Sequence, residues 1–249
     1  MSLFWKNERL EIVSDTFLKE DKNNSWVYTI GSINGSLELL RKIIYKIEET
    51  GLCKNDKVVF LGNIIGDTED TPKIIAMLRE YKHKRMKQVV ILRGLNEHRM
   101  ASSRATYLLS ESGKALIDAY RYRYGMENVR KSPYVDKKQI ILDRRWLDTL
   151  PSYYQNENYF FVNSGINPDI PLEKQHVGAL FHMREVFWKS PKIYTKLVVS
   201  AIPETKSEIR ANRIGLGTGS KEGEQLSCVI FNSKIKDKPV GQLLVEKTG

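Results

Sequence analysis

The sequence has few cysteines and no long hydrophobic run. Of its 249 residues only 2 are cysteines, Cys53 and Cys228, and both stand beside apolar stretches. Because a disulfide framework needs several cysteines at short spacings, we interpret both as small core residues. No apolar stretch approaches the roughly 18 residues of a membrane-spanning helix, and residues 1–6 lack the order of a signal peptide. We therefore expect a cytoplasmic protein with no membrane partner.

Acidic residues are scarce relative to basic ones. Lysine and arginine total 40 against 30 aspartates and glutamates, which gives a net charge of +10. This charge favours contact with nucleic acid, phospholipid or an acidic protein, without choosing among them. The densest basic cluster, residues 82–87, ends a predicted helix, where cations interact favourably with the helix dipole. We interpret it as a solvated helix end, with a binding patch as the alternative.

Apolar residues, in contrast, are plentiful. They make up 41% of the chain, and 10% of the chain is aromatic, which is typical of a globular protein with a well-filled core. No low-complexity segment or duplication of domain size divides the sequence. We expect a single domain over residues 1–249, in which residues 1–25 are a polar lead-in segment.

Three apolar runs, each followed by a glycine-containing loop, organise the first part of the chain. They are residues 27–30, 57–61 and 88–92, and the first loop is bracketed by Gly31 and Gly35. Glycines at such corners allow sharp turns and close backbone approach. Successive units of this kind predict a parallel sheet, with the loops gathered at the carboxyl ends of the strands.

Helices are predicted between these runs and after them. Apolar residues recur at helical spacing over residues 37–47, and Gly51 supplies the stop. A second helix carries its apolar face over residues 74–81, with Thr71 as its N-cap. Residues 101–133 are also predicted to be largely helical.

The last third of the chain has a β pattern. Apolar runs at residues 159–163, 197–200, 226–231 and 240–245 are separated by turns rich in glycine, proline and asparagine, and they predict a second sheet packed against the first. We interpret residues 164–195 as a long connection. The predicted fold is an α/β two-sheet β-sandwich flanked by helices.

The loops, in this order, resemble those of the calcineurin-like metallophosphoesterase superfamily, most closely the phosphoprotein phosphatases and the bacterial diadenosine tetraphosphatases. That family carries Gly-Asp-x-His-Gly, Gly-Asp-x-x-Asp-Arg-Gly, Gly-Asn-His-Glu, a strand ending in His-Ala-Gly, and a later Gly-His-Thr. The resemblance runs over residues 26–246 and includes Arg93-Gly94, Leu150-Pro151 and Arg184-Glu185. It implies the family's four-layer fold and the place of a two-metal centre.

The first two loops depart from the family pattern at each metal-binding position. Ser32 and Asn34 stand where the family has the aspartate and histidine of the first motif. Asn63 and Gly66 replace the two aspartates of the second motif, and Asp67 replaces its phosphate-binding arginine. A carboxylate at this last position repels the phosphate that an arginine attracts.

The later loops depart in the same way. Leu95 and Asn96 replace the ligand asparagine and the general-acid histidine of the third motif, and only Glu97 is kept. Asn163 and Ile202 replace the two later histidines. A metal pair brings about four positive charges together, which neutral oxygens do not stabilise, and an amide such as Asn96 cannot transfer a titrating proton. We therefore expect no metal, no cofactor and no catalytic residue.

The replacing asparagines have two interpretations. On this fold Asn34, Asn63, Asn96 and Asn163 are expected to cluster. The favoured interpretation is a hydrogen-bond network that satisfies itself, because asparagine is close in size to aspartate and histidine. The alternative is a polar pocket that binds a neutral or anionic ligand.

Three further charged groups leave alternatives open. Arg184 would either hold an anion in the cleft or form a structural ion pair. Asp67, Glu69 and Asp70 are interpreted as charges at a helix N-terminus, with a single hard cation as the alternative. A shifted register of the third loop would place His98 in the site.

These features favour a catalytically inactive phosphatase-like protein, a pseudophosphatase that acts as a binding or scaffold module for a protein partner. The alternative is a divergent serine/threonine phosphatase or dinucleotide polyphosphate hydrolase that uses Asp67, Glu97 and His98. A third possibility, suggested only by the net charge, is a component that binds nucleic acid or a ribonucleoprotein.

Overall fold

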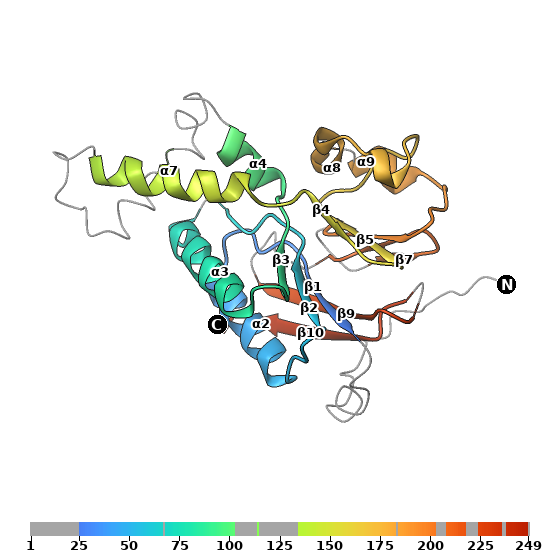
Figure 1. Ribbon diagram of the computed structural model, residues 1–249, viewed down its shortest axis with the longest axis horizontal. Helices are drawn as coiled ribbons and strands as arrows, with labels where there is room; N and C mark the ends of the chain where they lie inside the picture. Colours follow the sequence, from blue (N-terminus) through green and yellow to red (C-terminus); the bar gives the residue numbers. More distant parts are fainter. Residues whose placement is uncertain are drawn as a thin grey trace.

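Two five-stranded sheets lie face to face, and helices cover their outer sides (Figure 1). The computed structural model describes residues 25–66, 68–102, 114, 134–182, 184–202, 208–217, 224–235 and 238–248. For residues 134–138 and 184 it describes the backbone alone. The predicted lead-in segment and most of the helical prediction over residues 101–133 therefore lie outside the described residues.

The first sheet has the strand order β10-β9-β1-β2-β3. Its strands are β1 (Trp26–Ile30), β2 (Lys57–Phe60), β3 (Val89–Ile91), β9 (Gln225–Asn232) and β10 (Gly241–Glu246). The first three pair in parallel, as predicted. The expectation that β9 and β10 belong to the second sheet is wrong, because β9 pairs antiparallel with β1. The outer backbone groups of β1 need hydrogen-bond partners, and β9 supplies them.

The second sheet has the strand order β4-β5-β6-β8-β7. Its strands are β4 (Tyr153–Gln155), β5 (Tyr159–Val162), β6 (Leu197–Ser200), β7 (Glu208–Arg210) and β8 (Arg213–Gly215). The predicted runs at residues 159–163 and 197–200 form β5 and β6. The other three strands were not predicted, since three residues are too few to show an alternating pattern.

The helices match the apolar spacing of the sequence in the first half of the chain. They are α2 (Leu37–Glu49), α3 (Thr71–Arg85), α4 (Leu95–Ser102), α7 (Tyr134–Asp148), α8 (Val177–His182) and α9 (Arg184–Lys189), with a short 3-10 helix at Leu172–Lys174. Residues 164–195 are thus partly helical, which corrects the prediction of a long connection.

The N-terminus of α3 corrects a second detail of the prediction. The N-cap of this helix is Asp70, one residue before the predicted Thr71. The hydroxyl of Thr71 donates to the Gly66 carbonyl oxygen at 2.7 Å. Thr71 therefore ties the helix start to the preceding loop, a role that is compatible with a position inside the first turn.

Three apolar layers separate the sheets and helices. On β2, Val58 and Phe60 face the helices α2 and α3, whereas Val59 faces the second sheet. On β5, Phe161 faces the first sheet and Phe160 packs beneath α8 and α9. Successive side chains of a strand point to opposite faces, so each buried strand contributes to two layers. The result is the predicted four-layer α/β sandwich.

The two cysteines are free. Cys228 is buried in the core, and burial raises the pKa of its thiol, whereas Cys53 is only half-buried, which differs from its interpretation as a core residue. Among the described residues, no helix is both long and apolar enough to cross a membrane.

Candidate functional site

The loops that follow β1 and β2 touch each other through their backbones. The amides of Ile33 and Asn34 both donate to the Asn63 carbonyl oxygen, at 3.1 and 2.8 Å, and the amide of Gly35 donates to Ile64 at 3.2 Å. The predicted convergence of the loops at the carboxyl ends of the strands is thereby confirmed.

Glycines make this close contact possible. A Cβ atom on Gly62 would lie 2.5 Å from the Gly94 nitrogen, and one on Gly66 would lie 2.4 Å from the Asn34 carbonyl oxygen. No side chain fits at such distances, because real Cβ contacts are longer. Gly62 also has a φ of +90°, a conformation that glycine adopts without strain. The loop after β2 is therefore packed against the loop after β1 and against the loop after β3.

Glu97, the retained residue of the third motif, joins the second and third loops. Its side chain is fully buried. One carboxylate oxygen accepts hydrogen bonds from the amides of Asn63 and Gly94, at 2.8 and 2.7 Å, and the other accepts from Ile65 at 3.0 Å. Burial raises the pKa of Glu97, while these backbone donors act in the opposite direction. Both carboxylate oxygens are thus engaged by the backbone.

Asn63 stands at the position of the family's metal-bridging aspartate, and its amide is part of the same network. Its Oδ1 accepts a hydrogen bond from the Asn96 amide at 3.3 Å, and its Nδ2 lies 3.5 Å from the Ser32 hydroxyl. The Asn96 side chain donates in turn to the Ile65 carbonyl oxygen at 3.0 Å. The three loops are linked here by neutral groups.

Asn163 extends the network from the second sheet to the first. It lies at the end of β5 and is fully buried. Its Nδ2 donates to the Leu61 carbonyl oxygen at 2.8 Å, and its Oδ1 accepts from the Leu95 amide at 3.3 Å and the Ser164 hydroxyl at 3.2 Å. The side chain therefore fastens the end of β5 to the end of β2 and to the start of α4.

The remaining predicted site residues lie around this network or outside the described residues. Asn34 is half-buried and has a φ of +50°. Ile202 is half-buried after the end of β6. Asp67 lies outside the described residues, and Arg184 begins α9 with a side chain that the structure does not describe. The predicted anion contact of Arg184 stays a prediction.

Glu69 and Asp70, the described acidic residues near Asp67, face solvent or a lysine. Glu69 is exposed, and Asp70 forms an ion pair with Lys73 at 2.8 Å. An exposed pair of this kind is typical of a helix start in solvent. Among the described residues, no group of three histidine, cysteine, aspartate or glutamate side chains could hold a metal ion.

The residues present do not fit the two-metal centre that the fold implies. The oxygens nearest to the ligand positions, on Asn63, Asn163 and Glu97, already accept hydrogen bonds from backbone amides. The other positions carry Ser32, a hydrocarbon side chain or a half-buried asparagine. Apart from Glu97, whose carboxylate is bonded to the backbone, these described residues offer no carboxylate and no imidazole of the kind that stabilises paired divalent cations.

The ring of His98 is stacked on another ring, and the sequence did not predict this arrangement. Its ring lies against that of Phe181, with 4.6 Å between the centroids, and the Arg93 guanidinium lies 5.9 Å from the same Phe181 ring. Burial lowers the pKa of His98, with smaller contributions from Arg93 and His182. The burial of Glu97 among backbone donors corresponds to the unshifted register of the third loop, so His98 does not take the place of Glu97.

Comparison with known proteins assigns the fold. No protein-family model and no curated protein matches the sequence. Solved structures do match, and those whose function is described include a candidate diadenosine tetraphosphatase and a protein serine/threonine phosphatase. The chain shares the fold of these two proteins.

Three of these structures illustrate the likeness. A protein described as a candidate diadenosine tetraphosphatase superposes with a TM-score of 0.59 at 15% identity, over 89% of this chain and 93% of that one. A protein serine/threonine phosphatase from Saccharomyces cerevisiae, with similarity to human phosphatase PP5, gives 0.54 at 10% identity, over 94% and 87%. A hypothetical protein, PH1004 from Pyrococcus horikoshii, gives 0.51 at 18% identity, over 89% and 87%.

Proposed function

We propose that this protein is a pseudophosphatase, which uses a phosphoesterase fold as a binding or scaffold module for a protein partner and does not hydrolyse phosphoesters. One observation carries the proposal. At the ligand positions of the fold, the side chains of Asn63 and Asn163 hold the loops together through hydrogen bonds to the backbone. They act as structural ties between loops that would otherwise present metal ligands.

Charge supports the same conclusion. Hydrolysis of a phosphoester requires stabilisation of the negative charge that develops on the transferred phosphoryl group, and metals or arginines supply it in this fold class. The side chains of Asn63, Asn96 and Asn163 are neutral, and Glu97 is an acid. This set supplies no positive charge to an anionic transition state.

A divergent phosphatase or dinucleotide polyphosphate hydrolase is the competing function. It would need a titrating group within reach of a leaving oxygen. Glu97 is fully buried and bonded to three backbone amides. Of the two proposed residues that the structure describes, His98 is the remaining candidate, because its pKa is lowered and its ring is partly accessible.

Metal analysis and turnover distinguish the two functions. The protein is purified with Mn²⁺ present and analysed by inductively coupled plasma mass spectrometry, and hydrolysis of p-nitrophenyl phosphate, a phosphopeptide and diadenosine tetraphosphate is measured. We expect far less than one metal per chain and no turnover above buffer. Two equivalents of manganese, iron or zinc would overturn the proposal.

A pair of histidine variants serves as the internal control. Turnover that disappears in His98→Ala but persists in His176→Ala, where the histidine is exposed, would establish the hydrolase instead. Turnover that is equal in the wild type and both variants indicates a contaminating phosphatase, and repurification should then remove it.

A further inference from the structure

Two loops at the amino ends of the parallel strands, on the side of the first sheet opposite the site loops, are tied together by hydrogen bonds. These loops lead into β2 and β3. The Gln88 side chain donates to the Cys53 carbonyl oxygen at 2.7 Å, and the Lys57 ammonium donates to the Lys87 carbonyl oxygen at 2.6 Å. The Val58 amide donates to Gln88 at 2.9 Å. The two loops therefore form one surface.

A buried carboxylate fixes this surface to the core. Asp56 is 2% exposed and accepts hydrogen bonds from the amides of Trp26 at 3.0 Å and Cys53 at 2.7 Å. Burial raises the pKa of Asp56, and the two amide donors oppose that rise. Because Asp56 lies inside the protein and is bonded to β1, it acts as an anchor for the loop rather than a surface charge.

Basic residues are frequent in these two loops and in the last turn of α3, which precedes the second loop. We call this set the basic platform, and it consists of Lys54, Lys57, Lys82, His83, Lys84, Arg85 and Lys87. Two nearby glutamates are already paired: Glu48 with Arg85, and Glu80 with Lys84 at 2.8 Å.

Three lysines of the basic platform have neither a counter-ion nor a hydrogen-bond acceptor for the ammonium group among the described residues. Within the part of the chain that the structure describes, Lys54, Lys82 and Lys87 form no ion pair, whereas Lys57, which also forms none, is bonded to the Lys87 carbonyl oxygen. Lys54 and Lys87 are exposed and Lys82 is half-buried. Their charge is available to an external anion.

The backbone at the centre of the basic platform is held in an uncommon conformation. Met86 has a φ of +32° and its side chain is 69% exposed. A non-glycine residue keeps such a conformation only where the surroundings determine it. Here the next two residues, Lys87 and Gln88, are fixed by hydrogen bonds to the neighbouring loop. The backbone that carries Lys87 is thus held in place, and a fixed backbone lowers the entropy that is lost on binding.

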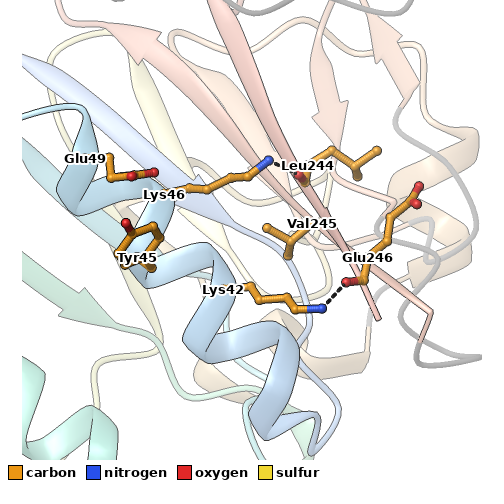
Figure 2. A pocket seen from close by; sticks show the side chains of 7 residues that line it. All are labelled: Lys42, Tyr45, Lys46, Glu49, Leu244, Val245 and Glu246. Atoms are coloured by element: carbon orange, nitrogen blue, oxygen red, sulfur yellow. Dashed lines mark hydrogen bonds between the residues drawn. The ribbon is translucent and has the colours of Figure 1, made fainter. Parts of the chain in front are cut away.

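The lysines of α2 provide a contrast. They line a hollow of about 440 Å³ between α2 and the edge strand β10 (Figure 2). In that hollow Lys42 donates to the Glu246 carbonyl oxygen at 2.7 Å, and Lys46 donates to the Leu244 carbonyl oxygen at 2.8 Å. These ammonium groups satisfy the open backbone of an edge strand. The three unpaired platform lysines make no such contact.

We propose that the basic platform binds the phosphate backbone of duplex nucleic acid without reading its sequence. Ammonium groups contact phosphate oxygens, and such contacts position a duplex but carry no base information. The platform contains no phenylalanine, tyrosine or tryptophan, and a single imidazole, that of His83, is a poor stacking surface for a run of unpaired bases. The net charge of +10 adds a favourable long-range field for a polyanion.

An anionic membrane is the less favoured partner. Binding at a lipid interface depends on buried apolar area as well as charge. The platform provides one exposed apolar side chain, Met86, which is too little area for stable insertion. The proposal does not depend on the absence of catalysis, because the platform and the site loops occupy opposite edges of the sheet.

Salt dependence tests the proposal quantitatively. Fluorescence anisotropy is measured with labelled random-sequence DNA and RNA duplexes of about 20 base pairs. Three unpaired lysines predict a slope of about −2.7 in log affinity against log salt, or a loss of roughly 40-fold between 50 and 200 mM. The triple variant Lys54→Gln, Lys82→Gln, Lys87→Gln should bind neither duplex measurably at 50 mM.

A charge-matched control locates the effect. The variant Lys174→Gln, Lys189→Gln, Lys247→Gln removes the same charge from exposed positions away from the platform, and it should keep most of the affinity and the full salt slope. Urea unfolding should give both variants the wild-type stability. The proposal is overturned by an equal loss in the two variants, by unchanged binding of the platform variant, or by binding to phosphatidylserine vesicles with no binding to either duplex.

Discussion

At the carboxyl edge of the first sheet the loops meet through backbone contacts, whereas at the amino edge they meet beneath long charged side chains. The carboxyl edge depends on Gly62, Gly94 and the buried Glu97. The amino edge depends on Lys57 and Gln88, whose contacts reach across an open surface. At the carboxyl edge the polar groups form hydrogen bonds with one another. At the amino edge positively charged side chains are exposed to solvent. The surface that we propose for a charged partner thus lies on the side of the sheet opposite the site loops.

The largest expected effect tests whether the carboxyl edge depends on one carboxylate. Glu97→Ala leaves three buried backbone amides without an acceptor and should lower the free energy of unfolding by about 4 kcal/mol. Glu97→Gln keeps one oxygen and should lose less. Urea unfolding measures both. At the amino edge Lys54→Ala should change stability by less than about 0.5 kcal/mol, and a larger loss there than at Glu97 would contradict the comparison.

The second prediction concerns the closeness of the loops. A Cβ atom on Gly94 would meet the Asn63 nitrogen at 2.3 Å and the Glu97 carboxylate at 2.8 Å. Gly94→Ala should therefore lower the free energy of unfolding by about 3 kcal/mol. Gly51→Ala is the matched control, because nothing lies within 4 Å and only its φ of +71° is unfavourable, which costs about 1 kcal/mol. Equal losses would show that loop contact is unimportant.

The third prediction separates a buried amide from an accessible one. Asn163→Asp places a carboxylate against the Leu61 carbonyl oxygen inside the core and should lower stability at pH 7 by about 3 kcal/mol. Asn96→Asp makes the same change at a half-buried donor and should lose about 1 kcal/mol, because water solvates part of the charge. Thermal unfolding of the two variants is the measurement, and the reverse order would contradict the network.

The smallest effect is expected at the amino edge. Met86→Gly relieves a φ of +32°, and the relief of about 1 to 2 kcal/mol is partly offset by the greater entropy of glycine in the unfolded chain. The net stabilisation should be about 0.5 kcal/mol, or a rise in melting temperature of about 1 to 2 °C. Met86→Ala keeps the strain and should leave the melting temperature unchanged. A rise with alanine would assign the effect to the exposed side chain instead.

Local patterns predicted the parts of the fold that depend on local chemistry. The three parallel strands and the helix over residues 37–47 follow from apolar spacing, and the meeting of the loops follows from the parallel order of the strands. The partner of β9 did not follow, because an apolar run fits either sheet. The three-residue strands such as β7 also escaped prediction, since they exist through pairing alone.

The site shows the same limit at the level of single residues. The positions of Asn63 and Asn163 could be aligned with family ligands, yet their donor and acceptor contacts depend on backbone groups more than 30 residues away. Periodicity carries no information about such contacts. The stacking of His98 on Phe181 joins residues from two different layers of the fold, and no local signal in the sequence marks it.

The pairing of β1 with β9 has a consequence for how the chain folds. Trp26 lies opposite Asn232, so the central strand of the first sheet acquires one neighbour across a separation of about 200 residues, a non-local contact of the type that slows folding. During synthesis, β1 and β2 leave the ribosome long before β9. Until then the nascent chain exposes an unpaired strand edge. A chaperone that covers this edge should therefore raise the yield of folded protein more than it raises the stability of the finished fold.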